Sequence, residues 1–448
     1  MRYGLDFGTS NCAIAIANQG RARLIPIDPA APEANTLRTV LWIDREGQAA
    51  IGEKAVSAFV AGNVGREIVK QRVSYKETIM TEFGEEYIQF DADTGIPGRF
   101  FQAIKSALRD PSYLGTEVFG VHYTIEDLVA TILRDMKRRA DEWLGEEVDE
   151  VLLGRPVRFG EDDEEDQLAE ARLRRAAELA GFRRVDVMYE PLGAAYYYES
   201  RLDRPEMALV FDFGGGTLDL SVVRLSPQAR ARADRSGDVL GVGGLLLGGN
   251  TFDEDLMEHR LMRYFGQHAT WQSARGDLLP MPAHIFAQLR RWYTISLLNE
   301  RDVMRFLQEM RRLVNEPRQI EALICLIVKN YGWDLFQEIE RAKCALSSER
   351  YTRIQFFQEA IAITELLTRT AYETIIAPHL ADIDRLIEEV LRQAGLRAQQ
   401  IDVVLRTGGT SLTPCIQALL ERRFGPEVIR EQDVFTSVVS GLAVAAEK

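Results

Sequence analysis

One short pattern occurs twice in this chain and restricts the folds that it can adopt. An apolar run predicted to be a β-strand ends in Asp-Phe-Gly, a turn rich in glycine or hydroxyl residues follows, and a second apolar run begins. The two copies are GLDFGTSNCAIA at residues 4–15 and ALVFDFGGGTLDLSVVRL at residues 208–225. A duplicated unit is the simplest explanation of such a repeat, so we expect two related α/β lobes.

Turns of this kind suit a phosphate group. Where glycine removes the side chain, the main chain can approach a ligand closely and direct its amides at it. Thr9, Ser10 and Thr217 add hydroxyl donors. A carboxylate beside a phosphate repels it unless a divalent cation lies between them, so Asp6 and Asp212 imply Mg²⁺, held directly or through water. Either turn alone would also fit an ordinary hairpin.

A third turn, Gly408-Gly409-Thr410, precedes a predicted helix and adds to this set. The chain has no G-x-x-x-x-G-K-[ST] sequence, and no G-x-G-x-x-G follows its first strand, which argues against P-loop and dinucleotide-binding folds. Three amide-rich turns together with two carboxylates therefore predict a magnesium–nucleotide site.

Composition excludes several other classes of protein. The net charge of −14 disfavours nucleic acid and anionic membranes as partners. No apolar run approaches the ~20 residues that would span a bilayer, so we expect no membrane segment. The cysteines have no C-x-x-C spacing and the histidines no H-x-x-x-H spacing, which argues against a zinc site and a disulfide framework. Asp6 lies where a signal peptide needs apolar residues, so we expect a cytoplasmic protein.

The sequence also predicts how the lobes are divided. We expect lobe I to comprise residues 1–205, with the helix in 432–448 returning to it, and lobe II to comprise residues 206–431. The stretch 251–346 is predicted to be a helical subdomain inserted into lobe II, because its apolar positions follow helical spacing.

Two helical segments carry more specific signals. Residues 124–144 are predicted to form an amphipathic helix, which begins after an N-cap at Thr124 and ends at Gly145. Within residues 283–345, the aromatic side chains at helical spacing are either core or a partner surface, and the core interpretation is favoured. These aromatic residues are Trp292, Tyr293 and Trp333.

Six segments of the chain resemble the DnaK-type heat-shock chaperones, and they occur in the order found in that family. They are the two Asp-Phe-Gly hairpins, the connecting segment EVLLGRPVRF…AAELAGF…YEPLGAAYYY, the glycine turn LGGNTFDEDL, the adenosine helix ERAKCALSS and the adenine loop VVLRTGGTSLTP. The resemblance implies an α/β, actin-like ATPase fold, in which two ribonuclease-H-like lobes flank a nucleotide cleft. It also implies an ATPase that binds ATP or ADP with Mg²⁺.

The resemblance implies roles for individual residues. Asp6, Glu190 and Asp212 match the residues that hold the hydrated Mg²⁺, and with Thr9 and Thr217 they form the implied catalytic set. Pro156 matches the proline that relays nucleotide state in the family. The implied nucleotide contacts are Gly8, Thr9, Ser10, Asn11, Gly214, Gly215, Gly216, Thr217, Gly248, Gly249, Asn250, Glu340, Lys343, Ser347, Gly408, Gly409 and Thr410.

The chain departs from the family pattern in three respects. The family's catalytic lysine follows a V-G-D-A-A-K stretch, whereas AIGEKAVSAF places Val56 there, so slow hydrolysis is expected; the other lysines considered are Lys54, Lys70 and Lys105. Cys344 replaces the arginine that stacks on adenine in the family. We also expect no peptide-binding β-sandwich. The expected role is therefore a nucleotide-dependent switch that acts on an unidentified protein partner.

Two other functions fit the same two-lobed fold. A metabolite kinase would use a side-chain base to activate an acceptor hydroxyl. A scaffold or filament subunit would bind nucleotide without cleaving it.

Overall fold

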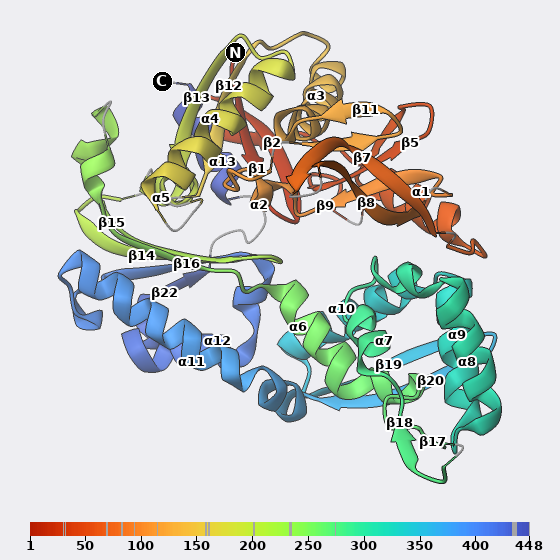
Figure 1. Ribbon diagram of the computed structural model, residues 1–448. Helices are drawn as coiled ribbons and strands as arrows, with labels where there is room; N and C mark the ends of the chain where they lie inside the picture. Colours follow the sequence, from red (N-terminus) through yellow and green to blue (C-terminus); the bar gives the residue numbers. More distant parts are fainter. Residues whose placement is uncertain are drawn as a thin grey trace. The chain divides into compact units, whose positions relative to one another are not determined.

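The computed structural model describes residues 1–447, apart from 30, 32, 69, 82–83, 94, 114, 157–158, 160–161, 200–201, 233–234, 274 and 432–436. The side chains at 70–81, 84–92, 196, 230–231, 236 and 437 also lie outside the description. The chain forms two compact units (Figure 1). Unit 1 comprises Met1–Ser57, Phe100–Phe252 and Ile376–Lys448, and unit 2 comprises Ala58–Arg99 and Asp253–Ile375. The predicted lobe boundaries stay a prediction, and of the predicted terminal helix, residues 432–436 and 448 lie outside the described residues.

Unit 1 contains two mixed β-sheets. The first is built from β1 (Tyr3–Phe7), β2 (Asn11–Asn18), β3 (Arg21–Leu24), β4 (Leu37–Arg38), β12 (Glu150–Arg155) and β13 (Arg184–Tyr189). Its strand order is β13-β12-β1-β2-β3, with β4 paired to β2. As predicted, β1 and β2 form an antiparallel hairpin around the first Asp-Phe-Gly, and β12 pairs with β1 in parallel.

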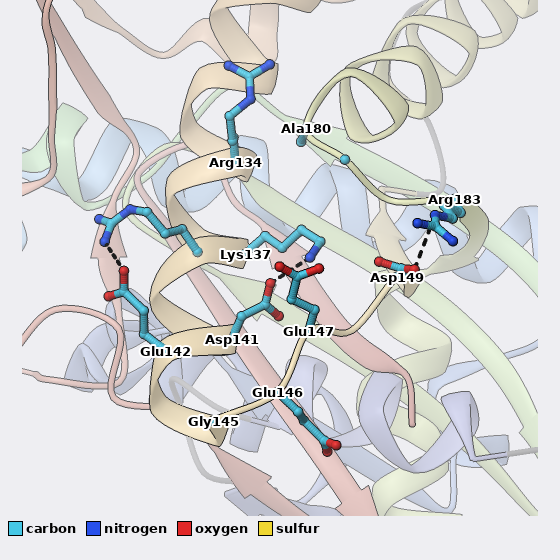
Figure 2. A pocket seen from close by; sticks show the side chains of 12 residues that line it. Arg134, Lys137, Asp141, Glu142, Gly145, Glu146, Glu147, Asp149, Ala180 and Arg183 are labelled. Carbon is cyan, nitrogen blue, oxygen red and sulfur yellow. Dashed lines mark hydrogen bonds and ion pairs between the residues drawn. The ribbon is translucent and has the colours of Figure 1, made fainter.

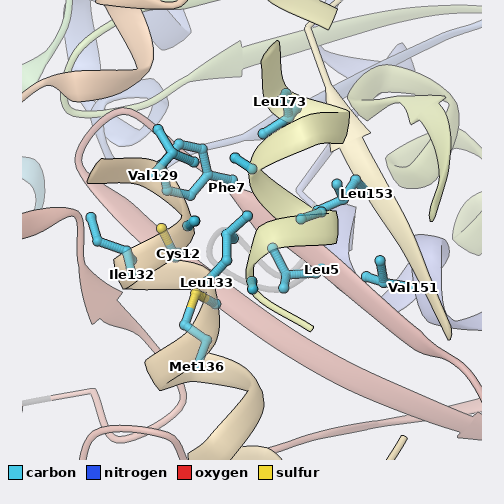
Figure 3. Close-up of a cluster of buried hydrophobic side chains, with 14 of the residues drawn as sticks. Leu5, Phe7, Cys12, Val129, Ile132, Leu133, Met136, Val151, Leu153 and Leu173 are labelled. Carbon is cyan, nitrogen blue, oxygen red and sulfur yellow. The ribbon is translucent and has the colours of Figure 1, made fainter. Parts of the chain in front are cut away.

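One face of this sheet packs against helices α3 (Ile125–Leu144) and α4 (Asp163–Leu179), and the buried side chains that fill the contact are drawn in Figure 3. Leu5 and Phe7 belong to this core. Because side chains alternate along a strand, Asp6 between them points to the opposite face. As predicted, α3 begins at a capping box between Thr124 and Asp127.

The second sheet repeats the arrangement of the first. Its strands are β14 (Glu206–Phe213), β15 (Leu218–Leu225), β16 (Val239–Leu245), β21 (Val403–Thr407) and β22 (Ile429–Glu431). The order is β16-β15-β14-β21-β22, so the hairpin β14–β15 has the parallel strand β21 beside it, as β1–β2 has β12. The predicted α/β class is confirmed, with two mixed sheets and surrounding helices.

Two helices join the sheets within unit 1. Helices α5 (Glu190–Glu199) and α13 (Ser437–Ala446) contribute Leu192 and Leu442 to a buried cluster. The same cluster contains Leu152 from the first sheet and Val210 from the second. Helices α5 and α13 therefore hold both Asp-Phe-Gly hairpins in one packed body.

The remaining elements of unit 1, some of which continue into unit 2, are short or peripheral. A three-stranded sheet has the order β6-β5-β9 and a hairpin joins β10 to β11. The elements are β5 (Val40–Asp44), β6 (Ala49–Ile51), α1 (Glu53–Asn63), β9 (Gly98–Gln102), α2 (Ile104–Ala107), β10 (Thr116–Val118), β11 (Val121–Tyr123), α6 (Gly249–Leu256), α11 (Arg369–Ala394) and α12 (Pro414–Phe424). Among the described residues, none of the helices has the length and apolar character to cross a bilayer.

In the part of the chain that the structure describes, unit 2 is mainly helical and also contains antiparallel strand pairs. The predicted helical stretch 251–346 is largely helical, except for the short hairpin of β17 (Thr270–Gln272) and β18 (Leu278–Pro280). The other hairpins are β7 (Lys70–Thr81) with β8 (Gly84–Asp93), and β19 (Tyr351–Gln358) with β20 (Ile361–Thr368). The helices wholly in this unit are α7 (Ala283–Leu289), α8 (Arg301–Leu313), α9 (Pro317–Val328) and α10 (Gly332–Ser348).

Trp292 lies in an aromatic cluster of unit 2. Its ring meets Phe59 edge to face at 5.5 Å and Trp333 at 4.9 Å between centroids. Trp292 is only 9% exposed, which supports the core interpretation for this side chain. Trp292→Ala is expected to lower the free energy of unfolding by about 3–5 kcal/mol, because it removes a large buried side chain and leaves a cavity.

Chemical denaturation followed by circular dichroism would measure this loss. Leu297→Ala provides a control in the same segment, because Leu297 is 54% exposed and its truncation should change the stability little. Equal losses in the two variants would contradict a core role for Trp292.

Candidate functional site

The turn between β1 and β2 is held in shape by its own backbone. Gly8 can carry no side chain, because a Cβ atom there would lie 2.2 Å from the carbonyl oxygen of Asn11. The Thr39 hydroxyl donates to the Gly8 carbonyl at 2.7 Å, and the Thr39 amide donates to the Ser10 carbonyl at 2.9 Å. The four predicted contacts from Gly8 to Asn11 thus lie together on one tight turn.

The turn between β14 and β15 lies directly against the first turn. A Cβ atom on Gly215 would be 2.9 Å from Ser10 Oγ, and one on Gly216 would be 3.1 Å from Thr9 Cγ2. Glycines in this turn therefore let Thr9 and Ser10 approach its main chain. The structure brings together the hydroxyl residues of the first copy and the glycines of the second.

Two further predicted segments support the second turn. The amides of Gly249 and Asn250 donate to the carbonyls of Gly214 and Gly215 at 3.1 and 2.8 Å. The Thr410 hydroxyl donates to the Gly214 carbonyl at 2.8 Å. All of these hydrogen bonds are accepted by backbone carbonyl groups of the second turn.

The glycines beside these segments allow a very close approach of main chains. A Cβ atom on Gly248 would lie 2.3 Å from the Gly215 carbonyl oxygen, and one on Gly408 would lie 2.3 Å from the Phe213 carbonyl oxygen. Gly408 also has φ of +76°, a left-handed conformation that favours glycine. The predicted turn from Gly408 to Thr410 is thus packed against the end of β14.

Acidic residues, of which Glu190 is buried and the others are half-buried, gather at the ends of the strands beside these turns. Asp6 and Asp212 are each the second-last residue of their strand, and Glu190 is the first residue of α5. Asp219 pairs across the hairpin with Asp212. Lys105, on α2, reaches this group and its Nζ lies 2.8 Å from Glu190 Oε1.

Gly154 on β12 provides the space for Glu190. A Cβ atom on Gly154 would lie 3.0 Å from Glu190 Cγ and 2.9 Å from Leu442 Cδ1. Pro156, the predicted relay residue, comes directly after β12 and its carbonyl accepts a 2.9 Å hydrogen bond from Arg155 Nε. The relay role of Pro156 stays a prediction.

Three of these acidic residues, Asp6, Asp212 and Asp219, keep their protons to a higher pH than exposed carboxyls do. Burial and the negative charge of Glu190 raise the pKa of Asp6 to about 8, although the positive charge of Lys105 opposes this rise. Burial and the charges of Glu190 and Asp212 raise the pKa of Asp219 to about 7. Burial likewise raises the pKa of Asp212 to about 6. Four carboxyl groups thus share one ammonium group, and a divalent cation would relieve their mutual repulsion.

The donor set fits a hydrated magnesium ion. Mg²⁺ prefers oxygen ligands and usually retains several of its water molecules. Among the residues that the structure describes, no three His, Cys, Asp or Glu side chains are close enough together to ligate a metal ion directly. The carboxylates of this cluster could accept hydrogen bonds from the waters of such an ion. The assignment of Asp6, Glu190 and Asp212 to the metal stays a prediction.

The sequence assigned no role to two residues of this cluster. The first is Lys105, which was named only among the other lysines of the chain and lies against Glu190. Val56, at the position where the family lysine was sought, is buried in α1, and Lys54 is exposed; the side chain of Lys70 lies outside the described residues. Asp219, the second such residue, accepts a hydrogen bond from Thr217 Oγ1 at 3.0 Å.

Three predicted nucleotide contacts lie in unit 2. Glu340, Lys343 and Ser347 are on α10, at spacings of three and four residues that place them on one side of the helix. Lys343 Nζ lies 2.8 Å from the Asp253 carboxylate. Cys344 is exposed on the same helix. The roles of these residues towards a nucleotide stay predictions.

A hollow elsewhere in unit 1 does not contain any of the candidate residues. It has a volume of about 820 Å³ and lies at the ends of α3 and α4 (Figure 2). Several of its charged side chains pair with one another, as Lys137 does with Asp141 at 2.6 Å and Arg183 with Asp149 at 3.2 Å. We therefore place the candidate site at the glycine turns.

Comparison with known proteins gives a consistent result. The family model described as "Hsp70 protein" matches residues 2–275 and 330–447. The chain is also similar to "Chaperone protein DnaK" of Thermus thermophilus, with 25% identity over 451 residues. That match covers 99% of this chain and 60% of the relative, so the chain spans about 60% of the length of that curated protein. Since the family model covers both Asp-Phe-Gly hairpins and most of the chain between and beyond them, the chain belongs to the Hsp70 family.

Proposed function

We propose that this protein binds Mg-ATP at the glycine turns of unit 1 and hydrolyses it to ADP and phosphate. The observation that carries the proposal is the gathering of four carboxyl groups and Lys105 beside two facing glycine turns. The actin-like fold with two ribonuclease-H-like lobes belongs to the same proposal, supported by the repeated hairpin and parallel strand.

Each group has a role in this reaction. The amides of Gly214 to Thr217 and the hydroxyls of Thr9 and Ser10 bind the phosphates. Asp6, Glu190 and Asp212 hold the waters of Mg²⁺, which when bound neutralises charge on the phosphates. These groups fix the phosphates before water attacks.

Two residues of this chain handle the charge and the proton of the attacking water. Lys105, held by Glu190, supplies positive charge where negative charge develops on the terminal phosphate. The Asp219 carboxylate, oriented by the Thr217 hydroxyl, accepts a proton from the attacking water. A pKa of about 7 suits this second task, because it lies close to the working pH.

The presence of Lys105 favours an ATPase over a scaffold that only binds nucleotide. The relative from Thermus thermophilus is named as a chaperone. We propose a chaperone-like role for this chain, as a nucleotide-dependent switch acting on an unidentified protein partner. A cytoplasmic location stays a prediction.

Calorimetric titration with ADP and with a non-hydrolysable ATP analogue, in Mg²⁺ and in EDTA, tests this function. We expect Asp212→Asn to weaken binding in Mg²⁺ at least about tenfold, because a residue that holds the metal waters is neutralised. Asp203→Asn, at an exposed position, should bind as the wild type does. Absence of binding by the wild type, or unchanged binding by Asp212→Asn, would refute the proposal.

Phosphate release distinguishes the alternative functions. We expect ATP turnover without any added acceptor. Turnover that required a sugar or a small acid would indicate a metabolite kinase, and tight binding without turnover would indicate a scaffold.

A further inference from the structure

We propose that Thr407 is a positioning residue for the metal site, whose buried hydroxyl holds the Asp212 carboxylate in the orientation that binds hydrated Mg²⁺. The inference rests on the proposed function, because it concerns the same magnesium–nucleotide site. Thr407 is the last residue of β21, and the roles implied by the family resemblance do not include it.

The strand register places Thr407 directly beside Asp212. On one side, Asp212 pairs with Asp219 across the antiparallel hairpin, and on the other it pairs with Thr407 across the parallel strands. Residues that lie opposite one another on neighbouring strands project from the same face of a sheet. Asp219, Asp212 and Thr407 therefore form one row across β15, β14 and β21.

The Thr407 hydroxyl is buried and available. Thr407 is 1% exposed, and among the described residues its Oγ1 atom has no partner at normal hydrogen-bond distance. The register nevertheless places this hydroxyl beside the Asp212 carboxylate, since the two residues lie opposite one another on β14 and β21. Polar contacts in ligand-free sites are often long and tighten when the ligand binds.

The first sheet of unit 1 shows which residue lies beside Asp6, at the position equivalent to that of Thr407 beside Asp212. Continuing the register of β1 and β12 from Leu5 and Leu153 places Gly154 beside Asp6. There the side chain of Glu190 occupies the space that a Cβ on Gly154 would enter. The corresponding residue beside Asp212 is Thr407. Its hydroxyl therefore occupies the place beside Asp212 that the Glu190 side chain occupies beside Asp6.

Packing alone does not explain a threonine at this position. β21 begins with the buried apolar residues Val403, Val404 and Leu405, and valine would fill the same volume as threonine. A buried hydroxyl without a partner costs free energy, whereas one that donates to a carboxylate regains it. The hydroxyl is therefore accounted for by Asp212, which Asp219 and Glu190 otherwise repel.

Thr407→Val tests the inference, because it removes the hydroxyl and keeps the shape. The measurement is the ratio of ADP affinity in Mg²⁺ to ADP affinity in EDTA, from calorimetry. We expect this ratio to fall about tenfold in Thr407→Val, as is usual when a group that orients a metal ligand is lost. The affinity in EDTA should stay unchanged, and Thr407→Ser, which retains the hydroxyl, should keep the wild-type ratio.

Ser221→Ala is the matched control. Ser221 lies on β15 of the same sheet, is fully buried and also lacks a hydrogen-bond partner for its hydroxyl among the described residues. Its loss should leave the magnesium-dependent ratio unchanged, which separates the Thr407 effect from the loss of any buried hydroxyl.

Each other outcome has a definite meaning. A wild-type ratio in Thr407→Val, or an equal fall in Thr407→Ser, overturns the role of Thr407 while the proposed function stands. Wild-type protein that binds no ADP overturns both. If Thr407→Val does not fold, the comparison of Thr407→Ala with Thr407→Ser decides by the same criteria.

Discussion

Lys105→Met is expected to lower the rate constant of ATP hydrolysis about 10²- to 10³-fold, the usual cost of losing one group that stabilises charge in a transition state. The affinity for Mg-ADP should change only a few-fold. Single-turnover measurement of phosphate release, together with calorimetric titration of ADP, separates these two effects.

The expected loss follows from the environment of Lys105. Burial alone would lower the pKa of Lys105, but the charges of Glu190 and Asp6 outweigh it and raise the pKa, so the ammonium group stays charged. The variant therefore removes the cation that opposes the repulsion at Asp6, Asp212 and Asp219. Mg²⁺ can still neutralise these carboxylates, which is why binding should survive while the chemical step slows.

Lys54→Met is the matched control for this prediction. Lys54 lies near the position where the sequence pattern placed the family lysine, but it is exposed on α1. Its replacement should leave the hydrolysis rate at the wild-type value. If Lys54→Met were impaired and Lys105→Met were not, the assignment of Lys105 would be wrong.

The phosphate turns could be predicted because their signals are local. Asp6 and Asp212 each end an apolar run, and the glycines and hydroxyl residues follow within a few positions. The structure shows both hairpins at the predicted places. Periodicity and turn chemistry suffice for such elements, since everything that they require lies within about a dozen residues.

Lys105 was named among the other lysines but could not be assigned to the site in this way, because nothing local marks it. It lies on the four-residue helix α2 after Ala103, a non-glycine residue with φ of +54°, and its partner Glu190 is 85 residues away in sequence. Its sequence neighbours, Ile104 and Ser106, do not distinguish it from other lysines. Its contact with Glu190 depends on how β12, β13 and α5 pack, which no single segment determines.

Asp219 could have been found by a simple rule. Strand alternation places it on the same face as Thr217, and a carboxylate within the buried run LDLSVV is unusual. The pairing of β21 with β14 could not be predicted from the sequence, because strands about two hundred positions apart leave no local signal of their register. The row that contains Thr407 was therefore visible only in the structure.

Asp219→Asn is expected to raise the melting temperature of the nucleotide-free protein in EDTA by several degrees at pH 8, and by less at pH 5. An unfolded Asp ionises with a pKa of about 3.9. In the folded protein, burial first and then the charges of Glu190 and Asp212 raise the pKa of Asp219 to about 7. The folded state thus binds the proton more tightly than the unfolded state does.

The sign of the pH dependence follows from this difference. Between about pH 4 and pH 7 the folded protein carries more protons than the unfolded chain, so the contribution of Asp219 to stability falls as the pH rises. Above pH 7 the Asp219 side chain is ionised in both states, and the folded protein bears the full free-energy cost of this charge in its environment. Asparagine has nearly the same shape and no charge at any pH. The variant therefore avoids the free-energy cost of the ionised carboxylate, which is larger at pH 8 than at pH 5.

Mg-ADP should reverse the advantage of the variant. At pH 8 a bound magnesium ion attracts the ionised Asp219 of the wild type, whereas the neutral amide of the variant gains nothing from it, so Mg-ADP should raise the melting temperature of the wild type more. Asp203→Asn, at an exposed position, should shift the melting temperature equally at the two pH values. A gain in Asp219→Asn that was the same at pH 5 and pH 8, or a loss at pH 8, would show that the carboxylates of this cluster do not repel one another in the ligand-free protein.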